Sequence, residues 1–141
     1  MKINRILLCI LCFVLVFLCC SCFLLKGSEY ICDIEQVESI QIVKLAAYVK
    51  GEYRFEYTVL ADISDHAAFV ERLNKVKQSE KWTDPGQLYV GDKVIKIEYR
   101  NGDYDLLDDG AQYLHRSGEN QYGYWTFDSE QYNALIADYL S

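Results

Sequence analysis

Twenty consecutive residues near the start of the chain, Ile6 to Leu25, carry no charged side chain. A helix of that length rises about 30 Å, which is the thickness of the hydrocarbon core of a bilayer. Lys2 and Arg5 precede the run and Lys26 closes it. The run therefore predicts that residues 1–26 contact a membrane through residues 6–25, as a transmembrane anchor or as a lipoprotein-type signal segment.

The cysteines inside this run keep those two alternatives open. The stretch Leu18-Cys19-Cys20-Ser21-Cys22 resembles the lipobox of bacterial lipoproteins, in which a Cys after small residues is lipidated and becomes the mature N-terminus. Cys22 is the best match and Cys20 the second. The stretch departs from the pattern, because Cys19 replaces the usual Leu and the next three residues stay apolar. A retained span, a lipoprotein and a freely secreted protein are the three outcomes.

Basic residues near the ends of an apolar segment orient it, because Lys and Arg favour the cytoplasmic side. Lys2 and Arg5 lie before the segment, whereas acidic residues follow Lys26 on the other side. The sequence thus predicts a protein of the cell membrane whose C-terminal domain faces the extracytoplasmic side.

The remainder of the chain has the size and charge of one acidic domain. Residues 33–141 carry 11 Lys and Arg against 20 Asp and Glu, a net charge of −9. Such a surface argues against binding of nucleic acid. We divide residues 27–141 into a short tether over residues 27–36 and a single domain over residues 37–141, because the length suffices for one core but not two.

Cys32 is the only cysteine outside the apolar run. It has no partner for a disulfide within the domain, so the domain is not a disulfide scaffold. Since Cys32 falls in the predicted tether, it is a candidate for an intermolecular disulfide between two anchored copies, and an unpaired thiol is the other reading.

Hydrophobic periodicity predicts an α+β fold with the order ββα-ββββ-α. The segments between residues 52 and 60 and between 93 and 100 alternate apolar and polar side chains, as half-buried antiparallel strands do. Asn101-Gly102 follows the second segment and predicts a tight hairpin turn in which both residues have positive φ. Other strands are expected at residues 39–45, 103–107, 112–116 and 122–127. Amphipathic helices are expected from Ser64 or Asp65 to Gln78 and from Asp128 to the C-terminus, both covering one face of the sheet.

The stretch Ile97-Glu98-Tyr99-Arg100-Asn101-Gly102, together with a Tyr-rich final helix entered through Phe127-Asp128, resembles small uncharacterised exported proteins of Gram-positive bacteria. The resemblance covers most of the chain once the signal-like start is included. It implies an exported location and an α+β fold, and it supplies no activity and no functional residues.

No motif in the sequence predicts a catalytic or cofactor site. His66 and His115 lack zinc-ligand spacing, and there is no phosphate-binding glycine loop. Asn101, Asp103, Asp105 and Asp109 partly resemble a calcium loop, but Leu106 and Gln112 stand where such a loop needs Gly and Glu. We therefore expect no cofactor and no catalytic residue.

The sequence leaves three functions open. The leading one is a non-enzymatic binding module for a protein, a peptide or a cell-wall polymer. The second is a small extracytoplasmic hydrolase that uses converging carboxylates, and the third is a structural subunit of a membrane complex.

Overall fold

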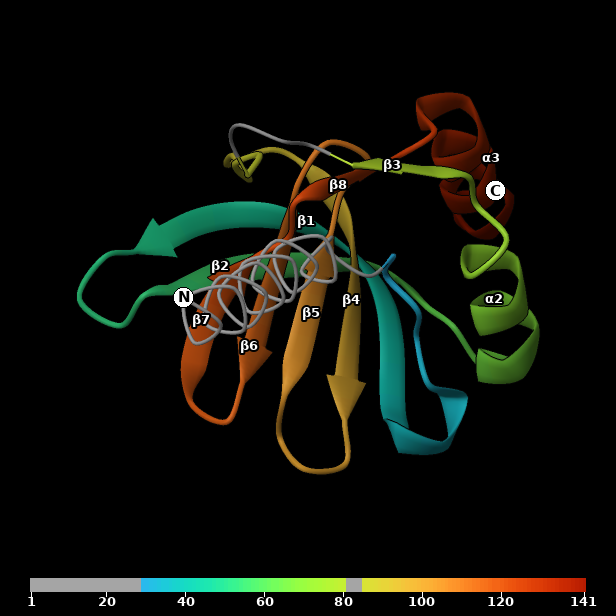
Figure 1. Ribbon diagram of the computed structural model, residues 1–141. Coiled ribbons are helices and arrows are strands. Elements are labelled where there is room, and N and C mark those ends of the chain that lie inside the picture. The colour runs from blue at the N-terminus through green and yellow to red at the C-terminus, as the bar shows by residue number, and fades with distance from the viewer. Residues whose placement is uncertain (1–28, 81–84) are drawn as a thin grey trace, which may run out of the picture.

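The computed structural model describes residues 29–80 and 85–141 (Figure 1). The elements, in chain order, are η1 (Ile34–Gln36), β1 (Val37–Val49), β2 (Arg54–Asp62), α2 (His66–Leu73), β3 (Gln78–Glu80), β4 (Lys93–Tyr99), β5 (Tyr104–Leu107), β6 (Gln112–Arg116), β7 (Glu119–Tyr122), β8 (Trp125–Phe127) and α3 (Ser129–Leu140). The predicted membrane segment, with Cys22, lies outside these residues and stays a prediction. Within the described ranges, no helix is long and apolar enough to cross a membrane.

Six strands form one antiparallel sheet in the order β2-β1-β4-β5-β6-β7, and β3 pairs with β8 in a separate two-stranded ribbon. The hairpin connections from β4 to β7 follow the predicted order. The α+β fold, with a mainly antiparallel sheet and two helices, is thereby confirmed.

β1 is long and bent, and this bend shapes the molecule. Its residues 37–44 pair with β4, whereas residues 45–49 pair with β2 alone. The register between β1 and β2 shifts twice, between Ile42 and Val43 and between Leu45 and Ala47. Since bulges increase the bend and twist of a strand, the long hairpin curves away from the plane of the sheet (Figure 1), and its turn reaches β6, where the Tyr113 hydroxyl bonds the carbonyl of Tyr53.

The bent sheet has a hydrophobic core on each face. One core holds buried side chains of both helices, among them Phe69 of α2 and Tyr132 of α3, packed on Ile95 and Ile97 of β4. The other lies under the hairpin and contains Leu45 and Tyr113. The two helices therefore cover one face, as predicted, and the end of the β1–β2 hairpin covers the other.

Both helices begin at aspartates whose side chains satisfy free backbone N–H groups. Asp65 accepts a hydrogen bond from the N–H of Ala68, and Asp128 accepts one from the N–H of Gln131, each at 3.0 Å. These are the N-caps expected from the sequence. The Gln131 side chain accepts from the backbone N–H of Lys77 at 2.9 Å, so it joins α3 to the chain before β3.

Several local predictions are wrong. The first helix ends at Leu73 and not at Gln78, and the predicted strand 122–127 is divided between β7 and β8. In the turn between β4 and β5, where both Asn101 and Gly102 were expected to have positive φ, only Gly102 does, at 87°. The turn with two residues of positive φ is instead Ser117-Gly118, at 51° and 82°.

Candidate functional site

The first described residues, Glu29 to Asp33, pack against the domain as an extended segment. Tyr30 and Cys32 are buried, at 6% and 2% exposure, and Ile31 between them is 73% exposed. This alternation is that of a strand. The segment was predicted as part of a tether, but from Glu29 onward its alternate side chains enter the main core.

Two side-chain amides bind the backbone of this segment in place of a neighbouring strand. The N–H of Tyr30 donates to the amide oxygen of Gln78, and the amide nitrogen of Gln78 donates to the carbonyl of Tyr30, both at 2.8 Å. Asn74 forms the same pair with the backbone of Cys32, at 2.9 and 3.0 Å. The segment is thus fixed to the chain that follows α2.

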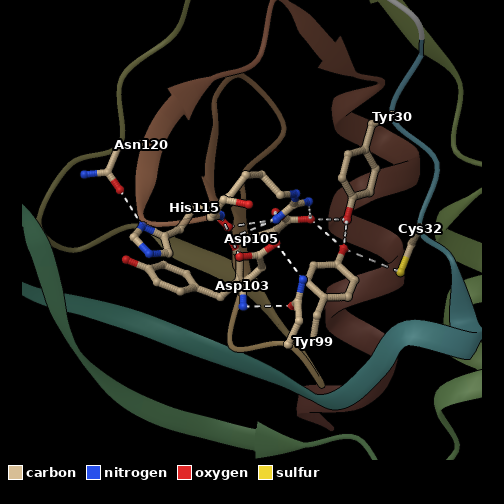
Figure 2. Close-up of polar contacts among 11 residues, drawn as sticks. Tyr30, Cys32, Tyr99, Asp103, Asp105, His115 and Asn120 are labelled. Atoms are coloured by element: carbon tan, nitrogen blue, oxygen red, sulfur yellow. Dashed lines mark hydrogen bonds and ion pairs between the residues drawn. The ribbon is translucent and has the colours of Figure 1, made fainter.

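Asp105 of β5 is fully buried and lies where this segment meets the sheet. Figure 2 shows the side chains of Tyr30 and Tyr99 directed toward it. Both hydroxyls donate to its Oδ2, at 2.8 and 2.6 Å. Arg116 of β6 donates to Oδ2 at 2.7 Å, and its other terminal nitrogen lies 2.5 Å from Oδ1. We call Tyr30, Tyr99, Asp105 and Arg116 the aspartate cluster.

The electrostatics of the aspartate cluster favour a fixed structural role. Burial is the main cause that raises the pKa of Tyr30 and of Tyr99, and the negative charge of Asp105 raises both further. Both phenols therefore remain neutral donors. Burial lowers the pKa of Arg116, but the hydrogen bond and the negative charge of Asp105 together raise it above its ordinary value. Three donors bind Oδ2 of Asp105 and the Arg116 guanidinium lies against Oδ1, so that carboxylate is poorly placed for acid-base chemistry.

Cys32 lies at the edge of the same cluster, with its Sγ 4.0 Å from the hydroxyl oxygen of Tyr99. Burial raises the pKa of the thiol to about 11. A buried, protonated thiol reacts poorly. The intermolecular disulfide predicted at Cys32 would therefore require the segment to leave the core, because its side chain does not reach the surface in this conformation.

The residues that partly resemble a calcium loop have other partners in the structure. Asp105 is bound to Arg116, and Asp103 accepts hydrogen bonds from Ser117 N–H at 2.8 Å and from the Asn101 amide at 2.9 Å. Over residues 29–80 and 85–141, no three His, Cys, Asp or Glu side chains are arranged to hold a metal ion.

The opposite face of the sheet carries a connected series of aromatic rings, which we call the aromatic array. Its members are Tyr48, Phe55, Tyr104, Tyr113, His115 and Tyr122, each within 6.3 Å of another between ring centroids. Tyr113 is buried at the centre, and its hydroxyl donates to the carbonyl of Tyr53 at 2.7 Å. Tyr48 and Tyr122, at the ends of the series, are both 42% exposed.

The two histidines have separate positions. His115 stacks on Tyr104 at 4.9 Å and its Nδ1 lies 2.7 Å from the side-chain oxygen of Asn120 (Figure 2). His66 lies in the first turn of α2. The structure thus brings neither beside Cys32.

The two edges of the sheet differ in length and chemistry. β7 has four residues, all exposed, and only Tyr122 is a large apolar side chain. β2 has nine residues, and Tyr57, Val59 and Leu60 are each about 40% exposed. The alternation in this strand predicted one buried face, but both of its faces are largely accessible because it lies at the edge of the bent sheet.

Two carboxylates line a cavity of about 500 Å³ between the loop before β4 and the turn after β5. Asp92 accepts a hydrogen bond from Tyr89 N–H at 2.7 Å. Burial, followed by the negative charge of Asp109 and Asp92, raises the pKa of Asp108 to about 6. This pair is one candidate for the converging carboxylates considered from the sequence.

The aspartate cluster was not predicted from the sequence. The alternation of Tyr30 and Cys32 with exposed neighbours was the available signal, but their assignment to a tether hid it. The sequence of this chain matches no protein-family model and no curated protein, and its structure matches no solved structure.

Proposed function

We propose that this chain is a membrane-anchored extracytoplasmic module that binds a protein partner without catalysing a reaction. The observation that supports it is the concentration of exposed large apolar side chains on the β1–β2 hairpin. Tyr48 on β1 and Tyr57, Val59 and Leu60 on β2 lie within one hairpin. Clustered apolar groups on a soluble surface mark interaction sites, and Tyr is enriched among the residues that dominate binding energy.

The aromatic array gives this surface a rigid base. Phe55 of β2 packs edge-on against the buried Tyr113 at 6.0 Å, and the Tyr113 hydroxyl binds the turn at Tyr53. A surface held in place before binding loses less entropy when a partner docks. The hairpin is therefore a better binding platform than a free loop of the same composition.

Proximity labelling in intact cells tests the proposal. The full chain would carry the labelling enzyme at its C-terminus, and residues 1–28 alone would be the background control. We expect a protein partner that is recovered with the wild type, recovered less with the Tyr48→Ser/Leu60→Ser variant, and recovered fully with Tyr89→Ser. Tyr89 is a matched control because it is 63% exposed but lies in the loop before β4. Recovery of no protein above background would contradict the proposal.

The anchor is tested separately by mass spectrometry of the mature N-terminus. A chain that retains Met1 is a membrane span, and a lipid-modified Cys22 at the N-terminus identifies a lipoprotein. An unmodified N-terminus beyond residue 22, with the protein in the medium, would contradict anchoring. The Cys22→Ala variant separates the first two outcomes, because only a lipoprotein depends on that thiol.

A hydrolase is the second candidate, and the carboxylates Asp92 and Asp108 in one cavity favour it. A carboxyl group with a pKa near 6 is suited to general acid catalysis near neutral pH. Release of reducing ends from soluble cell-wall oligosaccharides by the wild type, and its loss in Asp108→Asn, would support this candidate. No release by the wild type would remove it.

A further inference from the structure

The mode of partner binding can be inferred from the contrast between the two sheet edges. Exposed edge strands are normally kept from pairing with other chains by being short or charged. β7 fits that rule, because its four residues include Glu119, Asn120 and Gln121. β2 does not, because it is nine residues long and exposes Tyr57, Val59 and Leu60. One edge is therefore protected and the other is left open.

The register of β2 defines which part of the open edge is usable. Between Val59 and Ala61 the pairing with β1 skips Leu60, so Leu60 is an extra residue in β2. From Arg54 to Val59 the strand has no such insertion, and the second irregularity belongs to β1, at Ala46. Six residues, Arg54–Val59, thus present an uninterrupted edge.

The charges beside this edge favour a basic occupant. Arg54 forms an ion pair with Glu52 and also faces the charge of Glu56, so residues 52–59 carry two carboxylates against one guanidinium, a net charge of −1. Lys44 lies on β1, which is one strand inward from this edge, and Lys50 lies in the hairpin turn. Residues 33–141 together carry a net charge of −9, which attracts a basic partner and repels an acidic one.

We infer that the protein partner of this module adds an extended, basic segment as a new strand along Arg54–Val59 of β2. The inference rests on the proposed function and specifies its geometry. In strand addition, main-chain hydrogen bonds supply affinity and alternate side chains supply specificity. Apolar side chains of the incoming segment would pack beside Tyr57 and Val59, and its basic side chains would lie near Glu56.

A synthetic peptide probe tests the inference with the full chain in nanodiscs. The probe is a fluorescent, capped heptapeptide of alternating Val and Lys, and its control replaces every Lys with Glu. We expect fluorescence anisotropy to report binding of the Lys probe at least tenfold tighter than the Glu probe. Val59→Lys should weaken binding of the Lys probe at least tenfold, because it places a like charge at the edge. Gln121→Lys on β7 is the matched control and should leave binding unchanged.

Hydrogen exchange tests the inference on the wild-type protein, so the result does not depend on whether a variant folds. Strand addition should protect amides of residues 54–59 on probe binding and leave those of β7 unchanged.

Equal binding of both probes, no binding, or binding without protection of β2 would overturn the inference. So would a dimer by light scattering whose residues 54–59 are protected without the probe, because the occupant would then be a second copy. A cellular partner lost in Tyr48→Ser/Leu60→Ser but retained in Val59→Lys would overturn the inference and leave the proposed function standing.

Discussion

Arg116 holds the carboxylate of Asp105 with both terminal nitrogens, at 2.5 Å to Oδ1 and 2.7 Å to Oδ2. The carboxylate is fully buried, and the tyrosine that joins it from the N-terminal segment lies 75 residues away in the sequence. The Asp105 carboxylate thus links the N-terminal segment, through the Tyr30 hydroxyl, to the middle of the sheet, where Arg116 neutralises it.

Replacing Asp105 with Asn should destabilise the protein by about 3–5 kcal/mol, because it leaves the Arg116 charge without its partner in a largely buried site. The exposed ion pair between Arg72 and Asp138, also 2.5 Å long, provides the matched control. Asp138→Asn should cost less than about 1 kcal/mol. Urea unfolding measures both, and equal losses would show that the aspartate cluster contributes no more than a surface pair.

Gly123→Ala should destabilise the protein by about 1–3 kcal/mol through overpacking. A Cβ at this position would lie 2.7 Å from Cη2 of Trp125 and 2.8 Å from Oε1 of Gln112, which is closer than packed atoms approach. Gly51→Ala is the control, since its Cβ would meet nothing within 4 Å. Thermal unfolding of the two variants should differ clearly, and a Gly123→Ala variant as stable as Gly51→Ala would refute the packing argument.

Cys32 should react with iodoacetamide far more slowly in the folded protein than in urea. With its pKa raised from 9.0 to about 11, the thiolate at pH 8 is on the order of 100-fold scarcer in the folded protein, and burial slows the reaction further. Peptide mass spectrometry distinguishes Cys32 from the other five cysteines. Rapid labelling without urea would mean that residues 29–33 leave the core readily.

The contribution of Asp108 to the stability of the protein should fall as pH rises from about 4 to 6. Its folded pKa, about 6, lies above the ordinary value of 3.8. The folded state therefore holds the proton more tightly, and ionisation opposes folding above pH 4. At pH 7 Asp108→Asn should be more stable than the wild type by on the order of 1 kcal/mol, after allowance for solvent screening. The difference should vanish near pH 4, and a difference independent of pH would exclude this cause.

Tyr113→Phe should loosen the hairpin, because it removes the hydroxyl that binds the carbonyl of Tyr53. The ring would stay packed between Phe55 and Tyr122, so a loss of about 1 kcal/mol is expected. Hydrogen exchange should become faster at residues 49–55 and stay unchanged in α3. Unchanged exchange in the hairpin would show that the ring contacts alone hold it.

Local features of the fold could be predicted from the sequence because their causes are local. Asp65 and Asp128 cap helices through bonds that span three residues. The alternation in β4 likewise identifies a strand that is paired on both sides, although it does not reveal that Lys96 is buried beside Glu98 and the ring of Tyr57.

The candidate surfaces could not be predicted, because their causes are distant along the chain. The alternation from Tyr53 to Val59 is that of a half-buried strand, and only the bend of β1 carries this strand to an open edge. The same holds for Tyr30, whose burial depends on Asp105, Asn74 and Gln78 together.

The burial of Tyr30 also affects how the domain would respond to a pull on its anchor. In the proposed anchored state only four residues separate Leu25 from Tyr30, a span of about 14 Å when fully extended. No slack linker would absorb tension, so a force from a bound partner would act first on the aspartate cluster. The domain would then release its N-terminal segment under load before its sheet opens, and the exposure of Cys32 would record that event.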